Sequence, residues 1–302
     1  MSSTQSHRIS ARFAAVSLLA MGALLFTACG GKSQAADAGL QSVSIGSGEL
    51  SPVNDVISEV AKEKGIKITW QPFSDWTLPN QALVNAETDI NAFQHLAFLS
   101  AFNSAQGTDL TPVGSTQVTT WGLYSKEHAN VSSLPDGATL AIPNDPSNGA
   151  RALFLLQAAG LIELDENVGI YPTVDDITHN QKNIVFSPIV AQQLVNVYPD
   201  VDGIVVGAAT IDKALSITKD QALALDDPNS DTSLPYVNVV AVRGEDRDSE
   251  TYAKIADLWQ DQRVKDAIAE ETKGNSITVD IDVEKLRTTL AELEELADDI
   301  EQ

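Results

Sequence analysis

Residues 139–160, TLAIPNDPSNGARALFLLQAAG, combine two different elements in one short stretch. The first five residues are largely apolar and of strand length, which predicts a buried strand. Asp145 suits the N-cap of a following helix, Pro146 suits its first position, and Gly160 suits a stop after a run of strong helix formers. This order of strand and helix predicts a βα unit, the repeating element of α/β proteins.

The same alternation of short apolar runs and helix-length segments continues through most of residues 42–245. It predicts an α/β protein built on largely parallel sheets. Because 302 residues exceed the usual size of one domain, we expect two lobes. After residue 245 we expect helices only, which would pack on a sheet face. The expected strands are Val43–Ser47, Ile66–Phe73, Asp89–Phe93, Thr139–Pro143, Ile184–Ser187, Gly203–Val206 and Val237–Val242.

The N-terminal region has the pattern of an export signal. A weakly basic start is followed by an apolar run at residues 13–26, and Thr27 and Ala28 precede the single cysteine, Cys29. The apolar run is shorter than the roughly 20 residues that a membrane-spanning helix needs. Because residues 26–29, FTAC, resemble a lipobox, we expect a signal peptide at 1–28, lipid attachment at Cys29 and a flexible tether at 29–41. The alternative is an ordinary signal peptide in which Cys29 has no role.

The charge of the chain limits its partners. Removal of residues 1–28 would leave 17 Lys and Arg against 42 Asp and Glu, a net charge of −25. Such a charge repels nucleic acid and anionic lipid, so membrane attachment would depend on the lipid at Cys29. With Cys29 committed, no thiol remains for a disulfide, a nucleophile or a zinc site. We therefore expect an extracytoplasmic protein without nucleic acid, metal or cofactor.

Three segments place polar side chains at the ends of expected strands, where ligands bind in open α/β sheets. These segments are 91–95, 143–151 and 235–238. In the second, the N-terminus of the helix and Arg151, about one turn later, together favour an anionic group such as a carboxylate. The alternative is that Asp145 and Ser147 only cap the helix and that Arg151 lies in solvent.

Aromatic residues lie near the first of these segments. Phe93 and His95 are two positions apart on an expected strand end and so point the same way, with Trp76 in the preceding loop and Trp121 as further aromatic surface. Together they could line an apolar slot. The alternative is that Phe93 belongs to the core and that His95 is a hydrogen-bonded structural residue.

Six motifs, spaced in order between residues 43 and 273, resemble the methionine-binding lipoprotein family of the NlpA or MetQ type. They are DWTLPN (75–80), DINAFQH (89–95), GLYSK (122–126), IPNDPSNGAR (142–151), LLQAAGLI (155–162) and PYVN (235–238).

The resemblance implies a two-lobed periplasmic-binding-protein-like fold of type II, with a ligand cleft between lobes. The protein would be no enzyme but would capture methionine and deliver it to the permease and ATPase of an ABC importer. The family pattern implies lobe 1 at 42–123 and 235–302, and lobe 2 at 124–234. Trp76, Phe93 and His95 would surround the thioether, Asn148 and Arg151 would hold the carboxylate, and Asn238 would bind the polar end of the zwitterion.

The chain also departs from the family pattern. Gly207 follows Val206 where relatives have asparagine, and Thr119 and Thr120 replace a pair that is often Tyr/Glu-Pro. Glycine at 207 removes an expected polar contact, and Thr119 and Thr120 lie next to the expected crossing between lobes. Another small amino acid or a methionyl peptide is therefore an alternative ligand.

Three other classes of protein fit the sequence less well. A hydrolase would need a nucleophile and a base, but only His95, His128 and His179 remain after processing, and GSG at 46–48 matches no nucleophile motif. A metal receptor would need clustered ligands, and His95 has no histidine partner at a useful spacing. An adhesive or scaffolding lipoprotein has only the acidic surface in its favour.

Overall fold

The computed structural model describes residues 39–298. The predicted signal peptide, Cys29 and most of the predicted tether lie outside these residues. The first strand begins at Gln41, a residue that the sequence-based prediction assigns to the tether. Within residues 39–298, no helix is both long enough and apolar enough to cross a bilayer.

The first sheet has five strands in the order β2-β1-β3-β13-β4. Strand β1 is parallel to β2 and β3, whereas β13 is antiparallel to both of its neighbours. The bounds are β1 (Gln41–Ser47), β2 (Ile66–Pro72), β3 (Ile90–His95), β4 (Thr111–Ser115) and β13 (Asn238–Val242).

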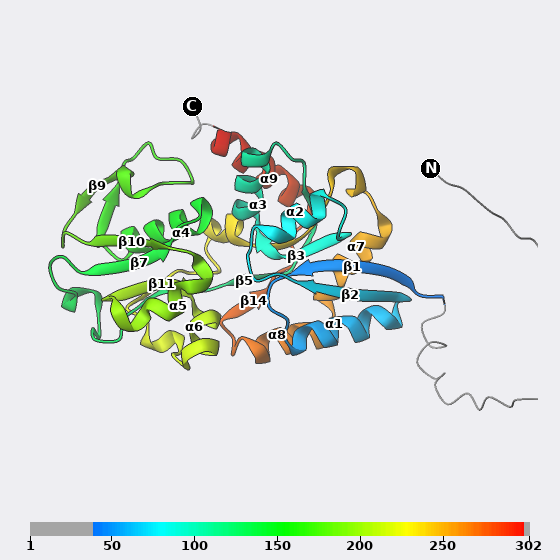
Figure 1. The fold of residues 1–302 in the computed structure, drawn as a ribbon, viewed down its shortest axis with the longest axis horizontal. Coiled ribbons are helices and arrows are strands. Elements are labelled where there is room, and N and C mark those ends of the chain that lie inside the picture. Colours follow the sequence, from blue (N-terminus) through cyan, green and yellow to red (C-terminus); the bar gives the residue numbers. More distant parts are fainter. Residues whose placement is uncertain (1–38, 299–302) are drawn as a thin grey trace, which may run out of the picture. The chain divides into compact units, whose positions relative to one another are not determined.

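Helices cover both faces of the first sheet (Figure 1). One face packs against α1 (Pro52–Glu63), α7 (Glu250–Ala256) and α8 (Gln262–Glu271). The other face packs against α2 (Leu78–Val84), α3 (Leu96–Gln106) and α9 (Val283–Asp298). Strand β13, inside the sheet, is therefore buried on both sides and is almost entirely apolar, whereas the edge strand β2 alternates between buried or half-buried and exposed residues.

The second sheet also has five strands, in the order β10-β7-β11-β6-β12. Its bounds are β6 (Trp121–Tyr124), β7 (Thr139–Pro143), β10 (Val185–Ile189), β11 (Gly203–Gly207) and β12 (Ala224–Leu225). Helix α4 (Pro146–Ala158) packs on one face, and α5 (Leu194–Val197) and α6 (Ala208–Leu215) pack on the other. A hairpin of β8 (Ile162–Leu164) and β9 (Ile177–Asn180) follows α4.

Two segments connect the sheets. The chain leaves the first sheet after β4 through β5 (Gln117–Thr119), which pairs with β14 (Ser276–Thr278). It returns after β12 through a loop and a 3₁₀ helix at Asp231–Tyr236. Each sheet has its own apolar core, so the expected α/β, two-lobed fold is confirmed.

Three sequence-based expectations differ from the structure. Both five-stranded sheets are mixed and not largely parallel, because β13 is antiparallel to β3 and β4, and β6 is antiparallel to β11 and β12. The expected boundary places residues 121–123 in lobe 1. In the structure these residues belong to β6, which pairs with β11 in the second sheet. The expectation of helices only after residue 245 is wrong, because β14 is a strand. A three-residue strand carries little pattern of its own, and β14 forms through pairing with β5, more than 150 residues away.

Candidate ligand-binding site

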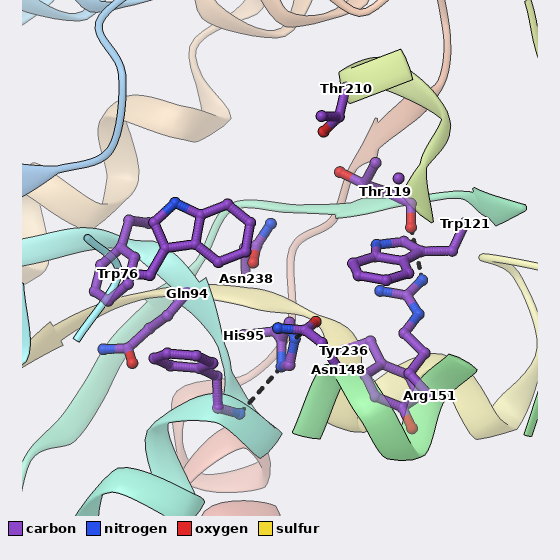
Figure 2. Close-up of a pocket in the computed structure, with 13 residues that line it drawn as sticks. Trp76, Gln94, His95, Thr119, Trp121, Asn148, Arg151, Thr210, Tyr236 and Asn238 are labelled. Carbon is purple, nitrogen blue, oxygen red and sulfur yellow. Dashed lines mark hydrogen bonds between the residues drawn. The ribbon is translucent and has the colours of Figure 1, made fainter. Parts of the chain in front are cut away.

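A cavity of about 130 Å³ lies where β3, β13 and the N-terminus of α4 meet (Figure 2). Its volume is close to the roughly 150 Å³ of an engineered cavity that holds benzene, so it suits a small molecule. All six residues expected to bind a ligand line it. The lining consists of Trp76, Phe93, Gln94, His95, Phe98, Thr119, Trp121, Asn148, Arg151, Gly207, Thr210, Tyr236 and Asn238.

Two strands and one helix bring distant residues together. The antiparallel pairing of β3 with β13 places Asn238 directly opposite His95. At the start of α4, Asp145 caps the helix by accepting a hydrogen bond from the backbone N–H of Asn148, as its sequence position predicts. The first turn of α4 then places Asn148 against His95 at the end of β3, and the next turn places Arg151 in the wall of the cavity.

One end of the cavity is aromatic. Trp76 lies in the loop between β2 and α2 and is partly exposed. Phe98 contacts Phe93 edge to face at 5.9 Å and His95 at 6.3 Å between ring centroids. Phe93 is thus not an ordinary core residue, because its ring faces the cavity while remaining half-buried. This end suits an apolar or polarizable group.

His95 is held in one protonation state by its neighbours. Its Nδ1 accepts a hydrogen bond from the backbone N–H of Phe98 at 3.1 Å, so the proton lies on Nε2, which donates to Asn148 Oδ1 at 3.0 Å. Burial lowers the pKa of His95 to about 4; the bond to Asn148 opposes this shift and the nearby Arg151 charge adds to it. The ring is therefore neutral at neutral pH. Both of its nitrogens are occupied by structural hydrogen bonds.

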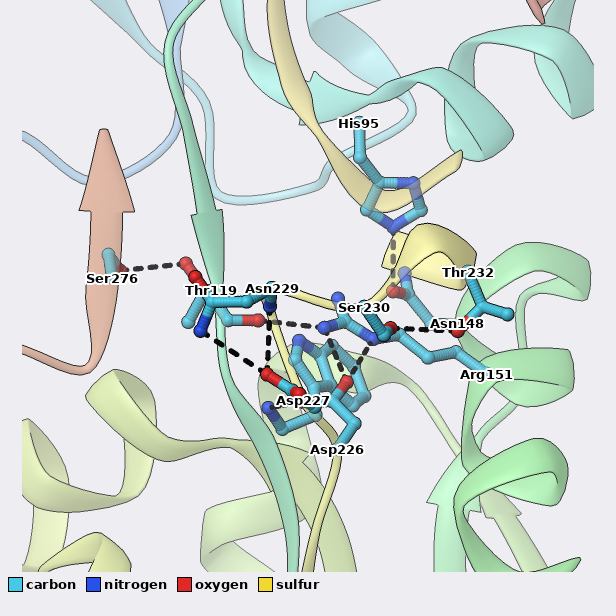
Figure 3. A network of polar contacts seen from close by, with 11 residues as sticks. His95, Thr119, Asn148, Arg151, Asp226, Asp227, Asn229, Ser230, Thr232 and Ser276 are labelled. Carbon is cyan, nitrogen blue, oxygen red and sulfur yellow. Dashed lines mark hydrogen bonds and ion pairs between the residues drawn. The ribbon is translucent and has the colours of Figure 1, made fainter. Parts of the chain in front are cut away.

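Arg151 is a buried, paired cation and does not lie in solvent. Its side chain forms an ion pair with Asp226, with Nε and Nη2 donating to Asp226 Oδ2 at 2.9 and 2.6 Å (Figure 3). Nη2 also donates to the carbonyl of Thr119 at 2.7 Å. The guanidinium lies 5.0 Å from the ring centroid of Trp121 and 4.5 Å from that of Tyr236, within cation–π range.

Burial and the charge of Asp226 have opposite effects on the pKa of Arg151. Burial lowers the pKa of Arg151, and the charge of Asp226 opposes this effect. Asp226 is itself positioned by a hydrogen bond from the backbone N–H of Trp121 at 2.7 Å. Within residues 39–298, Nη1 of Arg151 makes no hydrogen bond, so one edge of the guanidinium remains available to a ligand.

A buried amide network supports the cavity from the side of the first sheet. Asn80 and Gln94 exchange two hydrogen bonds of 2.7 and 2.6 Å, and Asn91 joins both of them. All three side chains are buried, and Gln94 also lines the cavity. Because satisfied buried networks are rigid, this one fixes the end of β3 that carries Phe93 and His95.

The free hydrogen-bonding groups of the cavity are mostly donors. Within the described part of the chain, the side-chain amide of Asn238 makes no hydrogen bond, while its backbone carbonyl accepts from Thr116. No Asp or Glu is among the residues that line the cavity in this part of the chain. The ammonium group of an amino acid would therefore find an amide oxygen and not a carboxylate.

Sequence reasoning missed several residues of the site. Phe98 lies one turn after His95 on the following helix, and Tyr236 belongs to the PYVN motif, so both carried a usable signal. Asp226 did not, because Asp227 and Asp231 lie in the same loop and nothing in the spacing indicates which of these acids pairs with Arg151. Gly207 was singled out as a departure, and it lines the cavity beside Thr210.

The two sheets, each with its own core, and the small cavity beside the crossing segments define a substrate-binding protein of the two-lobed periplasmic type. A family model described as NlpA lipoprotein matches residues 42–279. The chain belongs to this family.

Individual relatives agree with this assignment. The D-methionine-binding lipoprotein MetQ of Escherichia coli O157:H7 is 34% identical over 268 residues, which cover 88% of this chain and 96% of the relative. Protein PG110 from Staphylococcus aureus has 38% identity and a TM-score of 0.78, over 82% of this chain and 99% of its own. A nutrient-binding protein from Burkholderia cenocepacia, solved bound to methionine, has 35% identity and a TM-score of 0.73, over 78% and 99%.

Proposed function

We propose that this chain is the lipid-anchored substrate-binding protein of an ABC importer, and that it captures methionine or a closely related amino acid and delivers it to the permease. The observation that carries the proposal is a cavity lined by the aromatic residues Trp76 and Phe93, with a buried arginine, Arg151, across the cavity from Trp76 (Figure 2). The relatives described as methionine-binding support the choice of ligand. The protein would catalyse no reaction.

The six residues would have distinct roles in this proposal. Trp76, Phe93 and His95 would contact the thioether, because a polarizable sulfur is favourable against aromatic faces. The free edge of Arg151 would bind the carboxylate, with Asn148 beside it. Asn238 would accept a hydrogen bond from the ammonium group, since its side chain is otherwise unpaired.

The ligand would act by joining the two lobes. Phe93, His95 and Asn238 belong to strands of the first sheet, whereas Asn148 and Arg151 belong to the helix of the second. A molecule that contacts both sets stabilises the arrangement in which they are close, and so shifts an open–closed equilibrium. The lipid at Cys29 would keep the receptor beside its importer and raise its effective concentration there.

A thermal-shift screen of the full chain in detergent tests the ligand. It would include all amino acids, both methionine enantiomers and methionyl dipeptides. A ligand at 100 times its Kd stabilises the protein by about 2.7 kcal/mol. Stabilisation by a dipeptide alone would mean that the ligand is a peptide and not an amino acid. The absence of a shift in melting temperature with every compound would refute the receptor role.

Two further measurements test the remaining parts of the proposal. Mass spectrometry of the membrane-extracted N-terminal peptide would detect lipidated Cys29, and an unmodified cysteine would refute the anchor. For the site, Arg151→Met should abolish binding of the ligand found in the screen, while Arg263→Met removes an exposed arginine far along the chain and serves as the control. Equal affinity of the two variants would refute the carboxylate role of Arg151.

A further inference from the structure

Gly207 leaves a small open corner in the wall of the cavity. It ends β11 with a backbone conformation of φ −59° and ψ 131°, which any residue adopts, so glycine is not required by the chain. A Cβ atom at this position would lie 3.5 Å from Trp121 Nε1, 3.5 Å from Thr210 Oγ1 and 3.8 Å from a methyl carbon of Thr119. These are ordinary contacts. The corner therefore has room for one ligand atom, and such an atom would touch both polar groups.

The two polar groups at this corner have no partner in the described part of the chain. The indole of Trp121 is only 8% exposed, yet its Nε1–H makes no hydrogen bond among residues 39–298. Thr210, at the exposed rim, likewise has an unpaired hydroxyl. The ring of Trp121 is largely buried, but its N–H is not among the buried unpaired groups of the described residues, so it is accessible from the cavity that Trp121 lines. A ligand oxygen in the corner would therefore meet a fixed donor for which no protein group competes.

The chemistry of these groups defines what the corner can bind. An indole N–H is a donor only, so it cannot face an ammonium group. The neighbouring Arg151, whose guanidinium carbon lies 5.0 Å from the Trp121 ring, also offers donors only. A group with two acceptor oxygens satisfies both, whereas a carboxamide would turn its NH₂ group toward one of them.

We propose that the Gly207 corner is a carboxylate subsite, in which Trp121 Nε1–H and the Thr210 hydroxyl bind one oxygen of the ligand while Arg151 binds the other. This inference rests on the proposed function and narrows it to ligands with a free carboxylate. Glycine at 207 is then a specificity determinant, because any side chain would occupy the position of the oxygen.

Isothermal titration of the full chain in detergent with L-methionine and L-methioninamide tests the subsite. Loss of one donor to a charged acceptor predicts at least a tenfold weaker Kd for L-methionine in Trp121→Phe and in Thr210→Val. Thr210→Ser should recover the affinity lost in Thr210→Val. Gly207→Ala should weaken binding by a similar factor, and Gly169→Ala, at an exposed glycine with open space around it, is the matched control.

The amide supplies a second readout that a purely structural role would not change. The parent should prefer L-methionine over L-methioninamide, and this preference should shrink in Thr210→Val and Trp121→Phe. If Trp121→Phe does not fold, Thr210→Val alone tests the subsite. Thr210 is exposed, so its replacement should leave the fold intact. Parent-like affinity and preference in the variants would overturn the subsite and leave the receptor role intact. Failure of the parent to bind any amino acid would overturn both.

Discussion

Replacement of Asp226 by asparagine separates the structural role of Arg151 from its role toward a ligand. Asparagine keeps an oxygen that can accept from the backbone N–H of Trp121, but it removes the negative charge that lies 2.6 Å from Arg151. Arg151 is 4% exposed, so in Asp226→Asn a buried cation would remain without its partner.

The size of the effect follows from burial. Removing one partner of a buried ion pair costs about 3–5 kcal/mol, and the 24% exposure of the Asp226 side chain lets water offset part of it. We therefore expect the free energy of unfolding to fall by about 3 kcal/mol in the absence of ligand. For a chain of this size this corresponds to a decrease in Tm of about 6–12 °C.

The same change should strengthen ligand binding. A carboxylate that enters the site competes with Asp226 for the guanidinium of Arg151. Removal of the Asp226 charge should therefore tighten the Kd for a carboxylate ligand by about tenfold, or 1.4 kcal/mol. Urea unfolding measures the first effect and titration calorimetry the second. Asp227→Asn, at the adjacent exposed position, is the control. Parent-like stability together with an unchanged Kd in Asp226→Asn would refute the reasoning.

Three other predictions follow from the described residues. The pKa of His95, about 4, lies below its ordinary value of about 6.5. The neutral ring therefore contributes up to about 3 kcal/mol of stability, which is complete above pH 6.5 and is lost as the pH falls through 4. Urea unfolding of His95→Gln should show a smaller loss of stability over this pH range, and a pH profile identical to that of the parent would contradict the prediction. Asn80→Ala leaves Gln94 and Asn91 partly unpaired and should lower the free energy of unfolding by about 2–4 kcal/mol, against no more than about 0.5 kcal/mol for the exposed Asn85→Ala. Lys273→Met removes the cation 2.7 Å from the buried Asp212 and should lower Tm by several degrees in a thermal melt, whereas Lys265→Met should not; equal melting temperatures would mean that water replaces the lysine.

The local elements of the site were predictable because their signals are local. Asp145 and Pro146 mark the start of α4 by their own chemistry, and Thr139–Pro143 is a strand with the bounds that the sequence indicates. All six residues taken from the family resemblance line the cavity, and their binding roles stay predictions. The short strands β5 and β14 escaped prediction, since they exist only through pairing with each other.

By itself, the sequence determined the α/β class, the helix that carries Asn148 and Arg151, and the aromatic character of the segment around Phe93, because each depends on neighbours along the chain. Only the tertiary structure decided which charge pairs with Arg151, which proton His95 carries, and what lies beside Gly207. These properties come from contacts between residues far apart in sequence, such as Arg151 with Asp226 and Gly207 with Trp121. Burial sets the energy of each such contact, and burial is a property of the folded chain.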